Sequence, residues 1–304
     1  MSPTQAPSPV KALNLAARRA MHGTLWVALA AATTGAQATT LNTAQLSVGP
    51  SFAGGSGPYS GLDNQNGPAS LAGSATGGGN SSGAGTTFVN WGVVKLTGSA
   101  FGSLNTLARG IFRDELVLTA PGVPNGTAGI VSFAVSVNGS LFADAPGVAR
   151  ASWSLAADLG GGAFDINAGG SQNSAVNGGQ YVGSPFGTFV GTAPFAFGST
   201  LPLHVQLEAS AQAAFNNTIP GLPNAAFDLG QSLYWGGIVG VTVNGAPVSG
   251  FNVSSTSGTD YRNSMAPVPE PGALAMMLAG LGVLVGLQRR CQRQRSWCVA
   301  RPQG

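Results

Sequence analysis

The side chains that could carry out acid–base or nucleophilic chemistry are few and scattered. After residue 39 the only histidine is His204. It lies in a segment of alternating apolar and polar residues, a pattern that predicts a strand, and no nucleophile elbow between a strand and a helix accompanies it. Asp114 and Glu115 are adjacent, so on a strand they point to opposite faces and cannot together form the carboxylate pair of a glycosidase. A pair with a distant acid, such as Glu208 or Asp158, stays open.

The sequence gives little indication of a metal or cofactor site. Cys291 and Cys298 are separated by six residues with no histidine near them, which is not a zinc-ligand spacing. Calcium takes oxygen ligands alone, and aspartates such as Asp158 and Asp165 are present, but no Asp-x-Asp-x-Asp-Gly loop orders them. There is no P-loop, and no Gly-x-Gly-x-x-Gly stands between a strand and a helix. We therefore expect no catalytic residue, no metal and no cofactor.

Aromatic side chains are the candidates for ligand recognition. Tyr234 and Trp235 are neighbours in a strand-like segment, and Tyr181 and Phe186 lie in another. An exposed aromatic ring offers a flat apolar surface on which the apolar face of a sugar can stack. We therefore take Tyr234 and Trp235 as candidate carbohydrate-binding residues, the alternative being that these rings belong to the core.

The charge distribution argues against an ordinary cytosolic enzyme and against nucleic-acid binding. Only 8% of the 304 residues are charged, compared with about 25% in a typical globular protein. Between residues 39 and 268, five cations face nine acids, a net charge of −4. Scattered cations in a mildly acidic region do not form the basic footprint that nucleic-acid binding requires. The five cations are Lys95, Arg109, Arg113, Arg150 and Arg262.

The N-terminus has the features of a secretory signal peptide. Lys11, Arg18 and Arg19 precede the apolar run of residues 25–32, and a small-residue site, Ala36-Gln37-Ala38, follows it. The apolar run is too short to span a bilayer. We predict a signal peptide over residues 1–38, cleaved after the Ala36-x-Ala38 site by the general secretion machinery.

The C-terminus predicts a single membrane anchor. After Val268-Pro269-Glu270-Pro271 come sixteen uncharged residues, 272–287, and then an arginine cluster. Sixteen residues in a helix span ~24 Å, slightly less than the ~30 Å hydrocarbon core, and flanking side chains can cover the difference. The positive-inside rule places the arginines in the cytoplasm and the preceding chain outside it. We predict a transmembrane helix over 272–288 and a basic cytoplasmic tail over 289–304.

This C-terminal segment resembles the PEP-CTERM sorting signal of Gram-negative bacteria, in which a VPEP box, an apolar helix and a short arginine cluster occur in that order. The resemblance implies that Pro269, Glu270 and Pro271 form the recognition box for an exosortase, and that Arg289, Arg290 and Arg293 form the basic stop. It also implies an exported precursor, tethered to the inner membrane and then passed to the cell surface or medium, in association with exopolysaccharide. Residues 294–304 extend beyond the usual end of such tails.

The region between the two termini predicts an all-β fold. Residues 130–137 and 201–214 alternate between apolar and polar side chains, and Asn138-Gly139 and Asn244-Gly245 are hairpin signals. About nine short strands, among them 86–96, 225–235 and 238–243, favour an antiparallel β-sandwich or jelly roll over residues 88–262. Residues 39–87 contain a Gly-rich stretch with little to bury, which predicts a loop-like arm after one early strand at 44–48. Residues 263–271 form a linker carrying the sorting box.

The combined pattern predicts an exported, non-enzymatic protein that is a structural or adhesive component of an extracellular polysaccharide matrix. The alternative is a carbohydrate-binding module that uses exposed aromatic residues. A glycoside-cleaving enzyme is the third alternative, and it would require two carboxylates ~5 to 9.5 Å apart in a groove.

Overall fold

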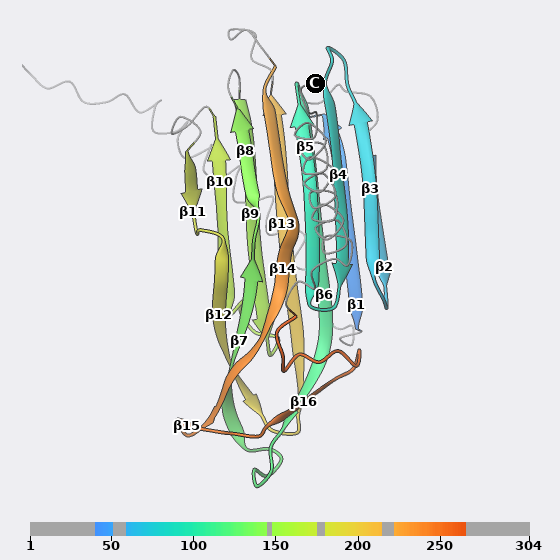
Figure 1. Cartoon of the computed structure of the whole chain (residues 1–304). Helices are drawn as coiled ribbons and strands as arrows, with labels where there is room; N and C mark the ends of the chain where they lie inside the picture. Colours follow the sequence, from blue (N-terminus) through green and yellow to red (C-terminus); the bar gives the residue numbers. More distant parts are fainter. Residues whose placement is uncertain (1–39, 51–58, 145–147, 175–179, 215–221, 266–304) are drawn as a thin grey trace, which may run out of the picture.

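The computed structural model describes residues 40–50, 59–144, 148–174, 180–214 and 222–265, which form two antiparallel sheets packed face to face (Figure 1). Sheet A runs from edge to edge through β11 (Tyr181–Gly183), β10 (Ile166–Asn173), β9 (Val148–Leu159), β13 (Thr200–Ala214), β6 (Leu104–Thr119), β1 (Leu41–Pro50) and β2 (Tyr59–Gln65). The short β16 (Asn252–Ser255) also pairs with β6. The predicted all-β sandwich is confirmed.

Sheet B is the second layer. It runs from edge to edge through β12 (Gly187–Ala196), β7 (Ala128–Val137), β14 (Asn224–Val243), β5 (Val93–Phe101), β4 (Ser82–Asn90) and β3 (Ala69–Thr76). Two short strands, β8 (Ser140–Asp144) and β15 (Ala246–Pro247), also pair with β14. The long β14 is therefore the central strand of sheet B, as β6 and β13 are central strands of sheet A.

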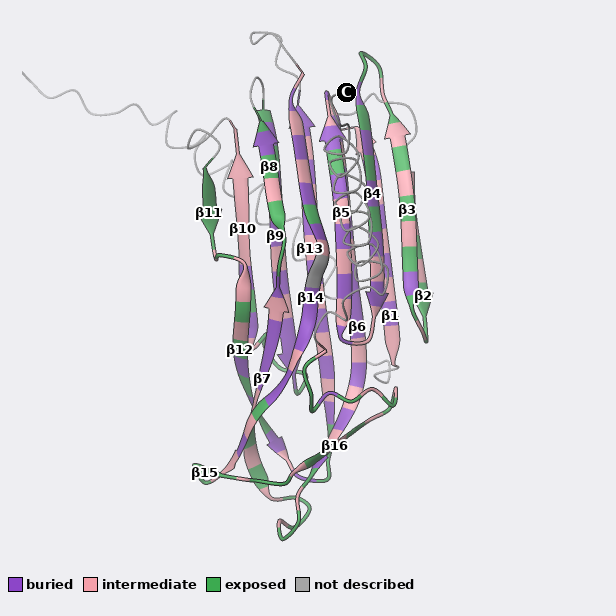
Figure 2. Ribbon diagram, viewed as in Figure 1, coloured by how far each residue is buried: buried purple, intermediate pink, exposed green. Residues whose placement is uncertain are grey.

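The core lies between the sheets and follows from the two-residue period of the strands. Along β13, Leu203, Val205 and Leu207 are buried, whereas the alternate residues His204 and Glu208 lie on the outer face and are partly exposed. The same alternation gives the striped pattern along the strands in Figure 2. The long central strands thus contribute one side to the core, as the alternation predicted.

The prediction of a loop-like arm over residues 49–87 is wrong for the described part of that stretch. It forms β2, β3 and most of β4, in addition to the predicted early strand within β1. The glycines suit the close packing of the two sheets, since a Cβ on Gly85 would lie 2.8 Å from Leu46 Cδ1. The segment gains stability from strand pairing and tight packing rather than from large apolar side chains.

Of the two predicted hairpin turns, the structure has one. Residues Asn138-Gly139 do not turn back into a hairpin, because β7 and β8 both pair with the same strand, β14. Gly139 also lacks the positive φ of a tight hairpin turn. Asn244 and Gly245 do have positive φ angles, 50° and 81°, and they connect β14 to β15 as predicted.

The strands of the structure also differ from the predicted ones in three ways. The expected strand over 86–96 is divided between β4 and β5 by a turn in which Gly92 has a φ of 79°. The expected strands 225–235 and 238–243 form one strand, β14, which absorbs irregularities near Gly237 and Gly240. Strand β10 was not predicted, because its sequence, INAGGSQN, has almost no apolar alternation.

The described ranges contain no helix long and apolar enough to cross a membrane. The predicted signal peptide (1–38), the transmembrane helix (272–288) and the basic tail (289–304) lie outside the described residues.

Candidate functional site

The proposed exposure of Tyr234 and Trp235 is wrong. Trp235 is 0% exposed and Tyr234 7%. The indole of Trp235 stacks on Phe133, with ring centroids 5.5 Å apart, and meets Tyr261 edge-on at 5.4 Å. Its Nε1–H donates to the Tyr261 carbonyl at 2.6 Å. Trp235 is therefore a core residue, and neither ring offers a sugar-stacking surface.

The other aromatic candidates close one open edge of the sandwich. Trp153 stacks on Phe186, with ring centroids 4.9 Å apart, and its Nε1–H donates to the Tyr181 hydroxyl at 2.8 Å. The Tyr181 hydroxyl in turn donates to the Ser184 carbonyl, and its ring lies over Gly170, where a side chain would collide with it. These contacts fix the aromatic rings between the sheets at the β10–β11 edge.

His204 lies in a row across the outer face of sheet A. Its cross-strand neighbours are Arg113 on β6 and Asp158 on β9, and the ring of Phe164 lies 5.8 Å away. Burial, together with Arg113 and Arg109, lowers the pKa of His204 to about 4. The imidazole is therefore neutral at pH 7, and its buried Nε2 atom has no hydrogen-bond partner within the described part of the chain.

Asp158 is the acidic member of that row. It is 7% exposed and accepts a hydrogen bond from the Gly162 amide at 3.3 Å. Burial raises its pKa, and the nearby Asp165 raises it further. Among the described residues, no group of three or more His, Cys, Asp or Glu side chains is placed to hold a metal ion.

Two carboxylate pairs lack the geometry of a glycosidase pair, Asp114 with Glu115 and Glu208 with Asp158. Asp114 is buried and accepts hydrogen bonds from the amide and hydroxyl of Ser257, whereas Glu115 lies on the opposite face of β6, as predicted. Glu208 is opposite Ser154, and Asp158 is opposite His204. Four residues therefore separate the two acids along the strands, about 14 Å at ~3.4 Å per residue, beyond the spacing that such a pair needs.

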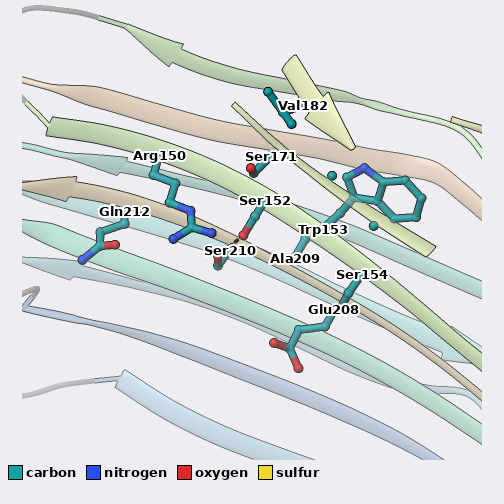
Figure 3. Close-up of a pocket in the computed structure, with 12 residues that line it drawn as sticks. Arg150, Ser152, Trp153, Ser154, Ser171, Val182, Glu208, Ala209, Ser210 and Gln212 are labelled. Atoms are coloured by element: carbon teal, nitrogen blue, oxygen red, sulfur yellow. Dashed lines mark hydrogen bonds between the residues drawn. The ribbon is translucent and has the colours of Figure 1, made fainter. Parts of the chain in front are cut away.

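A shallow trough of about 480 Å³ lies on the outer face of sheet A, over β13, β9 and β10. Strand register arranges its residues in three rows that cross the strands. The middle row, Ser210, Ser152 and Ser171, forms the floor, and the Ser152 and Ser210 hydroxyls are hydrogen-bonded at 2.8 Å. Figure 3 shows Arg150 and Gln212 together at one end and Glu208 at the other.

The two ends of the trough differ in charge. At the Glu208 end, Arg109 Nε lies 3.9 Å from the Glu208 carboxylate, and Arg109 Nη2 donates to Gln206 Oε1 at 2.6 Å. Burial raises the pKa of Glu208, although Arg109 opposes that rise. At the other end Arg150 is exposed and has no ion-pair partner within the described ranges. The trough thus combines a balanced ion pair with one unbalanced positive charge.

This trough was missed from the sequence. The polar alternation of Arg150, Ser152 and Ser154 on β9, and of Glu208, Ser210 and Gln212 on β13, is visible in the sequence. The sequence does not show the strand register that sets these residues side by side. It also did not predict β10, the neighbouring strand that contributes the third residue of each row.

Comparison with protein-family models matches residues 267–294 to the PEP-CTERM protein-sorting motif. The predicted resemblance is therefore confirmed, and the matched range contains Pro269, Glu270 and Pro271 as well as Arg289, Arg290 and Arg293. No curated protein and no solved structure matches the chain. Except for this motif, then, any account of function has to come from the sequence and geometry described above.

Proposed function

We propose that this protein is a structural or adhesive component of the extracellular polysaccharide matrix. The premise is that the chain carries the PEP-CTERM sorting motif and is therefore an exported protein sorted by an exosortase. The sorting motif is the observation that carries this proposal, because it directs the chain to the cell surface. A β-sandwich with only 8% charged residues and small polar outer side chains supports a role as a hydrated surface component.

We also propose that the protein is not an enzyme. A catalytic centre usually brings together titratable groups whose pKa values are tuned for proton transfer. Here the lowered pKa of His204 leaves it neutral beside two arginines, and Asp114 is occupied by Ser257. Both arrangements are better suited to stabilising the sandwich than to moving protons.

The alternative function, a carbohydrate-binding module that relies on aromatic stacking, loses its main support because Tyr234 and Trp235 are buried. Glycoside cleavage receives no support from the two carboxylate pairs described above, since Asp114 and Glu115 point to opposite faces and Glu208 and Asp158 lie too far apart. A surface component that contacts polysaccharide through hydrogen bonds is consistent with the geometry, and it does not require either of those features.

In the proposed route, the secretion machinery removes residues 1–38 at the Ala36-x-Ala38 site. The apolar helix over 272–288 then holds the precursor in the inner membrane, with Arg289, Arg290 and Arg293 as its cytoplasmic stop. The exosortase recognises Pro269, Glu270 and Pro271 and transfers or releases the exported domain.

The test is to measure the intact mass and both terminal peptides of the protein recovered from the envelope, the medium and the polysaccharide fraction of its host. We expect a mature start near Thr39, loss of everything after the sorting box, and co-fractionation with polysaccharide. A variant in which Pro269, Glu270 and Pro271 are all alanine should keep the tail and stay in the envelope, whereas Arg301→Ala, outside the matched motif, should behave as wild type. A wild-type protein that keeps residue 304, or that remains in the cytoplasm, would contradict the proposal.

A further inference from the structure

We propose that the trough over β13, β9 and β10 binds a carboxylate-bearing segment of a polysaccharide, with Arg150 recognising the carboxylate. The inference rests on the proposed function only in taking the matrix polysaccharide as the natural source of that segment. The site itself is argued from the residues of the trough.

The floor of the trough is suited to a hydroxyl-rich ligand. Ser210, Ser152 and Ser171 stand side by side on three neighbouring strands. Each serine hydroxyl can donate one hydrogen bond and accept others, which matches the mixed donor and acceptor character of sugar hydroxyls. Since the Ser152–Ser210 bond uses only part of this capacity, the row still has donors and acceptors to offer a ligand.

The small floor residues are the reason that the trough is hollow. Ser154 and Gly169 continue the floor toward Glu208, while the longer side chains of Arg150 and Gln212 form the rim at the opposite end. Four residues separate Arg150 from Ser154, about 14 Å along the strand. A chain segment lying along β9 would therefore contact both rims as well as the floor.

The charge of the trough favours an acidic ligand over a neutral one. Arg109 already balances the Glu208 carboxylate at 3.9 Å, whereas Arg150 has no ion-pair partner among the described residues. A guanidinium presents a planar set of donors that can bind a carboxylate through two parallel hydrogen bonds. Trp153 lines the trough, but it is only 3% exposed and its ring stacks on Phe186, so recognition there depends mainly on hydrogen bonds and charge.

The position of the trough within the sheet makes it rigid. Strand β9 pairs with β10 on one side and with β13 on the other, through twelve registered residue pairs in the second case. Paired central strands hold the backbone and the short serine side chains in place, so binding costs little in ordering the floor of the trough.

The experiment measures binding of the purified full chain, in detergent, to three oligosaccharides by isothermal titration calorimetry. Oligomannuronate and oligogalacturonate carry a carboxylate on each sugar, whereas a dextran oligomer of equal length is neutral. We expect both acidic oligomers to bind and dextran to bind at least about tenfold more weakly, because a hydrogen bond to a charged group contributes roughly 1.5–3 kcal/mol.

Two variants locate the binding in the trough. Arg150→Gln removes the guanidinium and should weaken binding of the acidic oligomers about tenfold, while Ser152→Leu fills the floor and should abolish it. The matched control is Lys95→Gln, which removes one positive charge from the outer face of sheet B and should leave affinity unchanged. Thermal unfolding of each variant checks that the fold is intact.

Equal affinity for dextran, failure of both acidic oligomers to bind, or unchanged binding by Arg150→Gln and Ser152→Leu would each overturn the inference. These outcomes are independent of the sorting proposal. Binding is measured on purified protein, so a failure of export leaves it unaffected. A failure of binding, in turn, leaves the terminal processing measured in the host unaffected.

Discussion

Replacing Trp235 with alanine is the perturbation that most directly separates a core role from a ligand-binding role at this position. The side chain is 0% exposed, stacks on Phe133 and contacts Tyr261. Truncating a buried tryptophan to alanine costs about 3–5 kcal/mol, from lost burial and the cavity left behind. The substitution also leaves the Tyr261 carbonyl without the indole donor that lies 2.6 Å away. We therefore expect a loss near the upper end of that range.

The assay is urea unfolding followed by circular dichroism, since the substitution itself alters tryptophan fluorescence. Single domains have a total stability of about 5–15 kcal/mol, so the expected loss is large enough to move the midpoint substantially. Trp235→Phe keeps an aromatic ring against Phe133 but removes the N–H donor, and it should cost about 1–3 kcal/mol. Val190→Ala, at a side chain 60% exposed, should change stability by no more than about 0.5 kcal/mol.

The reasoning would be refuted if Trp235→Ala lowered the free energy of unfolding by less than about 1 kcal/mol. If the same variant also lost binding to a polysaccharide while its fold stayed intact, the residue would be a ligand contact after all, as the sequence pattern suggested. A large loss of stability with unchanged ligand binding would establish the core role.

Three further predictions follow from other parts of the sandwich. Gly98→Ala should cost about 1–3 kcal/mol by overpacking, because its Cβ would collide with the Phe227 ring and lie 2.9 Å from Thr106 Cγ2; Gly240→Ala, with open space around it, is the control in the same urea assay. Asp114→Ala leaves the half-buried amide of Ser257 without its acceptor and removes one acceptor of the Ser257 hydroxyl; we expect a loss of about 1–3 kcal/mol and faster hydrogen exchange at the Ser257 amide, and normal exchange there would contradict this role. The pKa of His204 is lowered from 6.5 to about 4, mainly by burial, so the unfolded chain takes up a proton near pH 6.5 that the folded chain does not. Between pH 7 and pH 4, the wild type should therefore lose up to ~3 kcal/mol more stability than His204→Gln. Identical profiles of stability against pH for the two proteins would show that protonation of His204 does not destabilise the fold.

The strands with clear alternation could be predicted because their pattern is local. In β7 and β13, every second residue is apolar, and a strand places those residues on one face wherever it lies in the sheet. The strands with small side chains, β2, β3 and β10, lack that pattern. Their stability comes from hydrogen bonding to the neighbouring strands β1, β4 and β9, which the composition of each strand by itself does not show.

The C-terminal sorting motif needs no fold to be found. Its box, apolar segment and arginines follow one another in a fixed order, so the order of residues alone identified it. The same is true of the all-β class, since alternation and turn residues act over a few neighbouring positions.

The burial of Trp235 and the trough beside Arg150 were decided only by the tertiary structure. Alternation shows that Tyr234 and Trp235 point to opposite faces, but only the packing of β14 against its neighbours covers both of them. The row Ser210, Ser152 and Ser171 comes from three strands and depends on their register. A slip of one residue would send each of these side chains to the other face, because the strand period is two. Register is fixed by the long-range packing of the whole sandwich, and for that reason the sequence predicted the strands with clear alternation while only the tertiary structure decided the site.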